Sequence, residues 1–261
     1  MNKKITCGTR AIIENRKVGQ EHFILRFRSA FHENDTAPGQ FVSVKVDSPL
    51  MVLRRPLSVF DIEGNELSLF YKVVGSGTQA LSQKKPGEKL DVLEVLGKGF
   101  TIDVQGRSVA LVGGGMGVAP LFYLAKVLRK RKKDVHVYLG AQTAKEIFFE
   151  DGFQKMGCHV CVTTDDGSRN ICGTVCCGLE PDCAKKSFQM IYACGPRSML
   201  KAVSFIAEKA GIPCEVSLEE VMGCGFGVCL GCAVKVKDKE NPYKMVCKDG
   251  PVFHAEDIDW K

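Results

Sequence analysis

The sequence lacks the segments that carry a chain into or across a membrane. Its N-terminal stretch, MNKKITCGTRAIIENRKVG, has basic residues but no apolar core of about 7 to 15 residues and no small-residue cleavage site. Residues 108–125 carry no charge, but glycines and a proline interrupt this run, at Gly113, Gly114, Gly115, Gly117 and Pro120. A strand, a glycine turn and a helix explain it better than a membrane span. We therefore expect a cytoplasmic chain without a membrane partner.

The sequence also has no internal repeat and no low-complexity linker. Its 261 residues are 45% hydrophobic and 25% charged, which is a globular composition and excludes a disordered chain, a collagen and a coiled coil. Thirteen cysteines are too few for a disulfide scaffold, since these exceed roughly 8 to 10% cysteine, and an odd number cannot pair completely. In a reducing compartment they indicate metal or redox chemistry.

The formal net charge of +6 comes mostly from one run, residues 129–133, with the sequence RKRKK. Such a run can bind nucleic acid, but no aromatic side chains are interleaved with it. We interpret it as the C-terminal end of a helix, where cations complement the helix dipole, and expect no nucleic-acid partner.

The pattern of apolar segments divides the chain into three parts. Residues 1–103 contain short β-rich segments separated by glycine and proline turns, which predicts an antiparallel barrel or sandwich. Residues 104–217 alternate apolar runs with helical stretches, which predicts an α/β domain with a parallel sheet. Residues 218–261 are rich in glycine and cysteine and end in a predicted hairpin, AVKVK and YKMVC. The first predicted α/β helix has one apolar face, formed by Leu121, Leu124, Ala125 and Leu128.

The C-terminal part contains the most specific motif. Cys224, Cys229 and Cys232 have the spacing C-x4-C-x2-C, and Cys247 follows, which is the plant-type [2Fe-2S] pattern. The intervening Gly225, Gly227 and Gly231 can adopt positive φ and bring backbone N–H groups close to the sulfurs. A four-cysteine zinc site is the alternative, but only Cys229 and Cys232 form the CxxC pair typical of zinc ribbons.

Nine further cysteines lie outside this motif. Cys158 and Cys161 also form a CxxC pair, but they open a predicted strand, where residues three apart point to opposite faces. We expect Cys172, Cys176 and Cys177 to be small buried hydrophobic residues rather than ligands.

The run SVALVGGGMGVAPL predicts a strand, a glycine turn and a helix that opens at Ala119 and Pro120. Such a turn lets a pyrophosphate approach the backbone at a helix N-terminus. It matches G-x-G-x-x-G imperfectly, and the second strand ends in GAQT without the acidic residue that binds an NAD ribose. NAD and NADP therefore both remain open. Two other strand ends carry small or polar residues, TTDDG at 163–167 and CGP at 194–196.

The β-rich part carries two weaker signals. Arg54 and Arg55 precede a predicted strand, and arginine can hold a phosphate through two hydrogen bonds. Gly77 and Thr78 open the helical stretch TQALSQ, where they can cap the helix and offer N–H groups to the same anion. An arginine beside a proline is nevertheless more often a plain surface residue.

The order of these motifs resembles the ferredoxin-NADP reductase superfamily, and within it the electron-transfer subunits of dihydroorotate dehydrogenase B. The motifs that carry the resemblance are RRPLS, YKVVGSGT, GGGMGVAP, ACGPRSM and CGFGVCLGC with a later cysteine. The resemblance implies a flavin-binding barrel at 1–103, an NAD(H)-binding domain at 104–217 and a [2Fe-2S] domain at 218–261. It also extends to reductase subunits of transhydrogenases and hydrogenases.

The resemblance also implies roles for particular residues. Residues along FAD would be Arg55, Pro56, Leu57, Ser58, Tyr71, Lys72 and Val73, with Gly77 and Thr78 at its pyrophosphate. Residues facing the nicotinamide nucleotide would be Gly113, Gly114, Gly115, Gly117, Cys194 and Gly195. The cluster ligands would be Cys224, Cys229, Cys232 and Cys247.

The implied cofactors carry different numbers of electrons. A nicotinamide exchanges two electrons as hydride and a [2Fe-2S] cluster carries one, so FAD must connect them. The family's partner is an FMN-containing catalytic subunit that oxidises dihydroorotate in pyrimidine synthesis, assembled as two copies of each chain. We thus expect an oxidoreductase subunit with no catalytic acid or base of its own. The alternative from another class is a zinc-bearing, non-catalytic interaction subunit.

Overall fold

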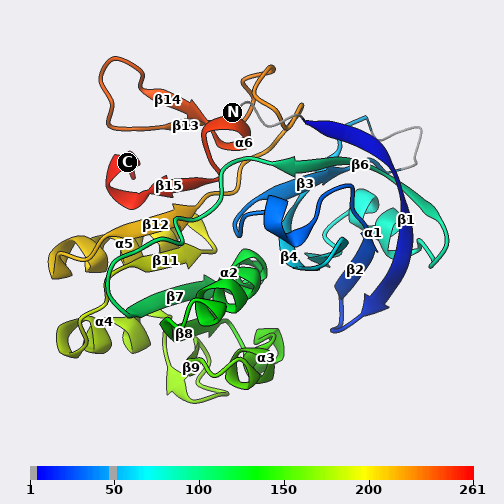
Figure 1. The fold of residues 1–261 in the computed structure, drawn as a ribbon. Helices are drawn as coiled ribbons and strands as arrows, with labels where there is room; N and C mark the ends of the chain where they lie inside the picture. The colour runs from blue at the N-terminus through cyan, green and yellow to red at the C-terminus, as the bar shows by residue number, and fades with distance from the viewer. Residues whose placement is uncertain (1–4, 47–51) are drawn as a thin grey trace. The chain divides into compact units, whose positions relative to one another are not determined.

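The computed structural model describes residues 5–46 and 52–261, which form two compact units (Figure 1). The first, here the barrel unit, comprises Met1–Gly99, Glu219–Val234 and Lys244–Pro251. The second, the sheet unit, comprises Phe100–Leu218, Lys235–Tyr243 and Val252–Lys261. The chain therefore leaves the barrel unit and returns to it twice.

The barrel unit is built on six antiparallel strands that close in the order β1-β2-β5-β4-β3-β6, which confirms the predicted barrel. Their residue ranges are β1 (Thr6–Lys17), β2 (His22–Arg28), β3 (Phe41–Val44), β4 (Arg55–Glu63), β5 (Glu66–Lys72) and β6 (Lys89–Leu96). Two short helices accompany them, η1 (Glu33–Asp35) and α1 (Ser76–Ser82).

Alternating apolar residues fill the interior of the barrel. Leu25 and Phe27 of β2 pair in register with Leu69 and Leu67 of β5, and all four side chains are fully buried. Residues two apart on a strand share a face, so the intervening polar residues of HFILRFR point away from this core.

The sheet unit contains a seven-stranded sheet with the order β10-β9-β8-β7-β11-β12-β15. All neighbours pair in parallel except β15, which is antiparallel to β12, so the predicted parallel sheet is confirmed. The strands are β7 (Ser108–Gly114), β8 (Asp134–Ala141), β9 (His159–Thr164), β10 (Ile171–Cys172), β11 (Ile191–Cys194), β12 (Cys214–Ser217) and β15 (Val252–His254).

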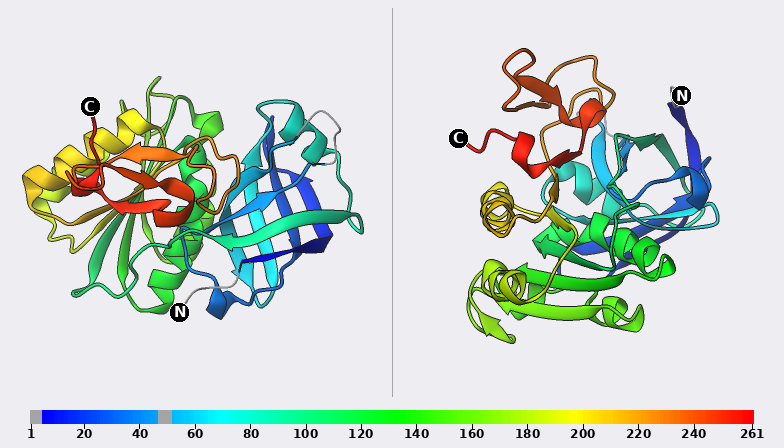
Figure 2. Two further views of the ribbon diagram at one scale, coloured as in Figure 1. Left: turned by 90° about the horizontal axis from the view of Figure 1, so that it is seen from above. Right: turned by 60° about the vertical axis from the view of Figure 1, so that its left-hand side comes forward.

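Helices cover both faces of this sheet, as Figure 2 shows for α2 in green and α5 in yellow. The helices are α2 (Val118–Lys130), α3 (Glu150–Lys155), α4 (Cys176–Lys185) and α5 (Arg197–Ala210), with the 3-10 turns η2 (Gly115–Gly117), η3 (Ala144–Glu146) and η4 (Ala255–Asp257). The chain adds β8 and β9 on one side of β7, then β11 and β12 on the other. This reversal creates a topological switch point between β7 and β11, where open α/β sheets bind ligands.

Helix α2 confirms the predicted apolar face, since Leu121, Leu124, Ala125 and Leu128 are fully buried. The helix begins at Val118, one residue before the predicted opening at Ala119. No helix in the described residues is long and apolar enough to cross a membrane.

The basic run at the end of α2 is held by the sheet unit itself. Arg129 donates to the carbonyl of Met156 (3.0 Å), and Lys133 donates to the carbonyls of Val104 and Gly106 (2.6 and 2.5 Å). Arg131 pairs with Asp103. These cations therefore serve the local fold, as expected for a helix end.

The C-terminal residues contain the predicted hairpin in shortened form, β13 (Ala233–Lys235) and β14 (Tyr243–Met245). Cys247, predicted at the end of a strand, instead lies on the single-turn helix α6 (Val246–Asp249). At this turn the Val246 N–H donates to the Cys232 carbonyl (3.0 Å).

The predicted domain limits at 103 and 217 fall near the changes of unit at Gly99 and Leu218. Residues 218–261 are divided between the two units, since β15 extends the sheet while the cysteine segments join the barrel. A separate domain at 218–261 stays a prediction.

Candidate metal centre and cofactor sites

Four cysteines gather in the barrel unit as two close pairs. The Cys224 thiol accepts the N–H groups of Val228 (3.3 Å) and Cys229 (3.4 Å), and the Cys224 N–H donates to the Cys229 sulfur (3.4 Å). The Cys232 and Cys247 sulfurs lie 3.2 Å apart, and the Cys247 N–H donates to Cys232 (3.4 Å). The structure thus places the four predicted ligands in two pairs, Cys224 with Cys229 and Cys232 with Cys247.

The two pairs differ in electrostatics. Burial acts to raise the pKa of Cys224, but N–H groups of Cys229, Phe226 and Val228 outweigh it and lower this pKa to about 6. Burial, followed by the neighbouring Cys232 thiol, raises the pKa of Cys247 to about 12. Cys224 therefore readily supplies a thiolate, whereas Cys247 needs a metal cation to lose its proton.

The loop before Cys232 uses the left-handed backbone region three times. Gly225 (φ +81°) and Gly227 (φ +88°) confirm the expected role of these glycines. The prediction was wrong for Gly231, because Leu230 (φ +59°) takes the left-handed conformation instead. A Cβ on Gly227 would lie 2.7 Å from Cδ of Lys248 on α6, so this glycine also permits close packing.

The donor set fits a [2Fe-2S] cluster. Four thiolates hold such a cluster, two on each iron, and the chain supplies two pairs. The segments that carry the two pairs are in contact, since a Cβ on Gly227, between Cys224 and Cys229, would lie 2.7 Å from Cδ of Lys248, the residue after Cys247. Backbone N–H groups point at all four sulfurs, and such hydrogen bonds tune an anionic cluster.

Both cluster segments rest on the barrel. A Cβ on Gly225 would lie 3.5 Å from Leu96 of β6 and 3.6 Å from the Ser43 hydroxyl of β3. The Lys98 N–H donates to the carbonyl of Gly250, just after α6 (2.6 Å). Ser43 in turn pairs with Pro56 of β4. The cluster loop therefore contacts the strand next to the one that carries residues 55–58.

Two of the predicted flavin residues, Arg55 and Gly77, lie in direct contact. A Cβ on Gly77 would be 2.6 Å from the Arg55 guanidinium, so a larger residue here would displace this side chain from its present position. The Thr78 hydroxyl accepts the N–H groups of Val74 (2.9 Å) and Gly75 (3.3 Å) and shapes the turn into α1. Pro56, Leu57 and Ser58 are half-buried along β4.

A cavity of about 580 Å³ borders this turn. Its lining residues are Glu21, Lys72, Val73, Val74, Gly75, Ser76 and Gln79. Lys72 and Val73 thus border open space, but the Tyr71 side chain does not. It is buried in the barrel core, its hydroxyl donates to Asn15 Oδ1 (3.0 Å), and burial raises its pKa above the ordinary value. Only the main chain of Tyr71 can therefore take part in a site here.

The predicted nucleotide residues meet at the switch point of the sheet. Gly113 of β7 and Cys194 of β11 are partners in register. A Cβ on Gly117 would lie 2.0 Å from the Cys194 carbonyl oxygen, and one on Gly114 would lie 2.5 Å from Met199 Sδ. Gly195 adopts φ +155° and packs against Gly114. These glycines allow the two strand ends and the start of α2 to approach closely.

An acidic turn lies beside the strand that lacks the expected acidic residue. The Asp165 and Asp166 N–H groups donate to the carbonyls of Ala141 and Gln142 at the end of β8 (3.0 and 3.2 Å). Ser168 donates to Asp166 through its hydroxyl and N–H, which lowers the pKa of this exposed carboxyl. The sequence shows the acidic segment TTDDGS. That this segment lies next to β8 follows only from the pairing of β9 with β8.

None of the thirteen cysteines, all of which lie in the described residues, forms a disulfide bond. Cys158 is buried and Cys161 half-buried, whereas Cys172 and Cys177 are exposed. The expectation that Cys172 and Cys177 are buried was wrong, because they flank the edge of the sheet at the two-residue strand β10.

Comparison with known proteins gives two family matches. Residues 219–259 match the family model for the iron-sulfur cluster binding domain of dihydroorotate dehydrogenase B, and residues 111–204 match an oxidoreductase NAD-binding domain. The first match favours the iron-sulfur interpretation over zinc.

Curated relatives include the dihydroorotate dehydrogenase B (NAD(+)) electron transfer subunits of Geobacillus sp. (strain WCH70) and Caldanaerobacter subterraneus subsp. tengcongensis. They are 42% and 40% identical to this chain, and each alignment covers 95% of it and 96% of the relative. A solved NADH-dependent reduced ferredoxin-NADP oxidoreductase has a TM-score of 0.86 at 32% identity, covering 100% of this chain and 92% of that one. The chain belongs to the family of dihydroorotate dehydrogenase B electron transfer subunits.

Proposed function

We propose that this chain carries electrons between NAD(H) and a separate dihydroorotate-oxidising subunit, in pyrimidine synthesis. When bound, FAD exchanges hydride with nicotinamide and single electrons with a [2Fe-2S] cluster. The observation that carries the proposal is the position of the cysteine loop, which contacts β3 while the flavin motif occupies the neighbouring strand β4. Adjacent strands are about 4.8 Å apart, so this barrel suits short-range electron transfer.

The residues of the chain bind and orient the cofactors. Arg55, with Gly77 and Thr78, would hold the FAD pyrophosphate, because its guanidinium lies against Gly77 in the first turn of α1. The residues along the remainder of the flavin would be Pro56, Leu57, Ser58, Lys72, Val73 and the main chain of Tyr71.

The switch point of the sheet unit would hold the nicotinamide nucleotide. Its residues would be Gly113, Gly114, Gly115, Gly117, Cys194 and Gly195. Asp165 and Asp166 favour NAD over NADP, since carboxylates beside the end of β8 repel a 2′-phosphate and accept hydrogen bonds from a ribose diol.

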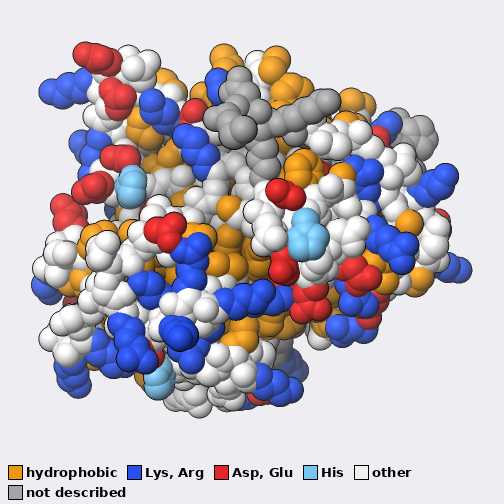
Figure 3. All heavy atoms as spheres, in the orientation of Figure 1, with side chains coloured by type: hydrophobic (Ala, Val, Ile, Leu, Met, Phe, Trp, Pro, Cys, Tyr) orange, Lys and Arg blue, Asp and Glu red, His pale blue; other side chains and the backbone are white. Residues whose placement is uncertain are grey.

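The surface around the first cysteine pair supports a protein partner. Exposed apolar side chains surround Cys224 and Cys229, namely Val221 (80% exposed), Phe226 (42%), Val228 (72%) and Leu230 (62%). Hydrophobic side chains gather at the top of the view in Figure 3, over the loop between β12 and β13. Contiguous exposed apolar surface marks interaction sites. The partner we propose is the FMN-containing catalytic subunit, with two copies of each chain.

The variant Phe226→Asp should weaken the complex with the catalytic subunit about 10- to 100-fold, as expected for an aromatic residue in an interface. Iron content should stay unchanged, because Phe226 contributes only its main chain to the cysteine loop. Phe205→Asp is the matched control, since this phenylalanine is also exposed but lies on α5. Affinity measured by surface plasmon resonance checks the prediction, and equal affinity of both variants would contradict the assigned surface.

The function is tested by mixing the purified chain with the catalytic subunit. We expect dihydroorotate-dependent reduction of NAD+ only when both are present. The solved oxidoreductase of similar fold supports a second candidate, a reductase subunit of a transhydrogenase-type complex. A chain with flavin, iron and NADH oxidation that gives no coupled turnover with this partner would favour that second candidate.

A further inference from the structure

Three side chains of the sheet unit that the proposed cofactor sites do not use converge at the start of two neighbouring strands. Asp134 opens β8, His136 follows two residues later on the same face, and His159 opens β9. His136 and His159 are partners in the parallel register. They lie at the amino ends of the strands, whereas the nucleotide residues lie at the carboxyl ends.

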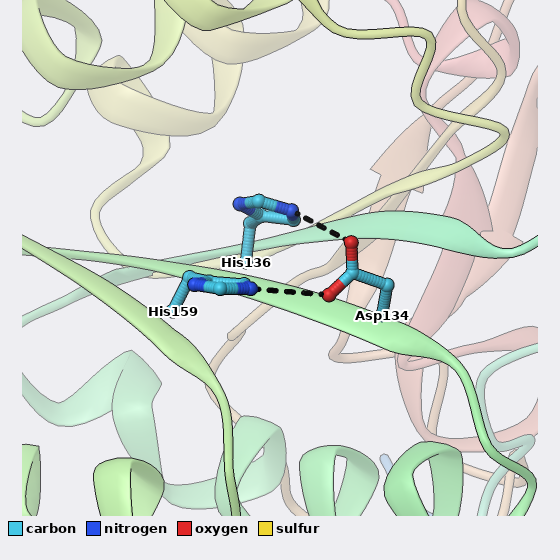
Figure 4. A group of neighbouring side chains, drawn as sticks. All are labelled: Asp134, His136 and His159. Atoms are coloured by element: carbon cyan, nitrogen blue, oxygen red, sulfur yellow. Dashed lines mark hydrogen bonds and ion pairs between the residues drawn. The ribbon is translucent and has the colours of Figure 1, made fainter.

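The two imidazole rings share one carboxylate. His136 Nε2 lies 3.3 Å from Asp134 Oδ2, and His159 Nε2 lies 3.3 Å from Oδ1. The rings stack with centroids 4.6 Å apart at 23° (Figure 4), and both present a nitrogen to the carboxylate. One ligand atom from each residue lies within 4.8 Å of the others.

These separations are long for hydrogen bonds but suit ligands around one ion. N–H···O bonds have a usual length of about 2.9 to 3.0 Å. Tetrahedral zinc with bonds of about 2.0 to 2.1 Å holds its ligand atoms about 3.3 Å apart, which is the separation of each Nε2 from the carboxylate oxygen that it faces. We propose that Asp134, His136 and His159 bind a divalent transition-metal ion, of which zinc is the representative, through both Nε2 atoms and a carboxylate oxygen.

The surroundings provide a fixed ligand and an open side. The His136 side chain is 10% exposed and packs edge-on against Phe188, with centroids 5.3 Å apart. The His159 side chain is 66% exposed, so an ion approaches from its side and keeps water as a fourth ligand. The ion would tie β8 to β9 at the amino ends of these strands, remote from the nucleotide residues at the carboxyl ends.

Lys186 opposes binding at this site. Its Nζ lies 3.2 Å from His136 Nδ1 and 2.8 Å from Asp182 Oδ2. A metal on Nε2 leaves the proton on Nδ1, where it faces the lysine ammonium, another donor. Binding therefore requires Lys186 to turn fully toward Asp182. Removing the ammonium should tighten the site.

The experiment uses the holoprotein with its cluster, dialysed against zinc ions alone, with zinc and iron measured together by mass spectrometry. Wild type and His254→Ala should retain about one zinc per chain more than His159→Ala, with equal iron in all three. His254 is the control because it is an exposed histidine of the same unit. Equal zinc in wild type and His159→Ala would overturn the proposal, since zinc then binds elsewhere or only at the cysteines.

A second variant tests the role of His136 Nε2. Lys186→Met should bind zinc about tenfold more tightly than wild type. Changes of about this size are usual when a residue that contacts a metal ligand, but not the metal, is replaced. Isothermal titration of holoprotein with zinc measures the ratio. Unchanged or weaker binding in this variant would contradict ligation through Nε2.

Discussion

The variant Cys229→Ser should lose the cluster and, with it, electron transfer to the catalytic subunit. Cys229 forms the exposed pair with Cys224, and serine cannot supply the thiolate that an iron requires. We expect iron to fall from about two per chain to background. Dihydroorotate-dependent NAD+ reduction should fall at least about 100-fold. This loss exceeds the roughly 10- to 100-fold loss expected when a residue that only supports a metal ligand is replaced.

The same variant should keep NADH oxidation by artificial acceptors, because the flavin and nucleotide residues lie on other segments of the chain. Cys172→Ser is the control, since it removes another exposed thiol that belongs to the sheet unit. Iron analysis and the two assays are run in parallel. Coupled turnover retained in Cys229→Ser would exclude the assigned electron route.

Arg55→Ala should weaken FAD binding by about 10- to 100-fold, the range for losing hydrogen bonds from a charged donor to phosphate. The guanidinium lies against Gly77 at the turn into α1, where the pyrophosphate is proposed to bind. Flavin retained after gel filtration, and the dissociation constant by fluorescence titration, measure the loss.

The neighbouring arginine provides the control for this variant. Arg54 pairs with both carboxylate oxygens of Asp91 (2.9 and 3.0 Å). This ion pair joins Arg54 to strand β6 of the barrel and does not involve the turn into α1. Arg54→Ala should lower thermal stability but leave FAD affinity within about twofold, since partly exposed ion pairs contribute about 1 kcal/mol or less. An equal loss of FAD in both variants would contradict the distinct role of Arg55.

Features that depend on local sequence were predictable. The barrel, the parallel sheet and the buried face of α2 followed from residue periodicity, and the cysteine spacing indicated the cluster loop. These signals lie within short windows, where side-chain direction follows from strand or helix period. The binding roles of the flavin and nucleotide residues were predicted from the family resemblance. Contacts in the structure make several of these residues neighbours, and their binding roles stay predictions.

Features that depend on pairing between distant segments were not predictable. The inward position of Tyr71 is set by the register of the barrel, and its hydroxyl reaches Asn15 on β1. The acidic turn after β9 reaches β8, and His159 meets Asp134, only because those strands are neighbours. The left-handed conformation at Leu230 arises from loop closure around the cysteines, against the preference of a leucine.

The two cysteine pairs differ in accessibility, with Cys229 exposed and both Cys232 and Cys247 buried. An iron held by the outer pair would meet dissolved oxygen and peroxide directly, because water reaches its ligands. The apolar residues around that pair become a shield once a partner covers them. Assembly of the complex would then protect the cluster from oxidative damage as well as complete the path for electrons.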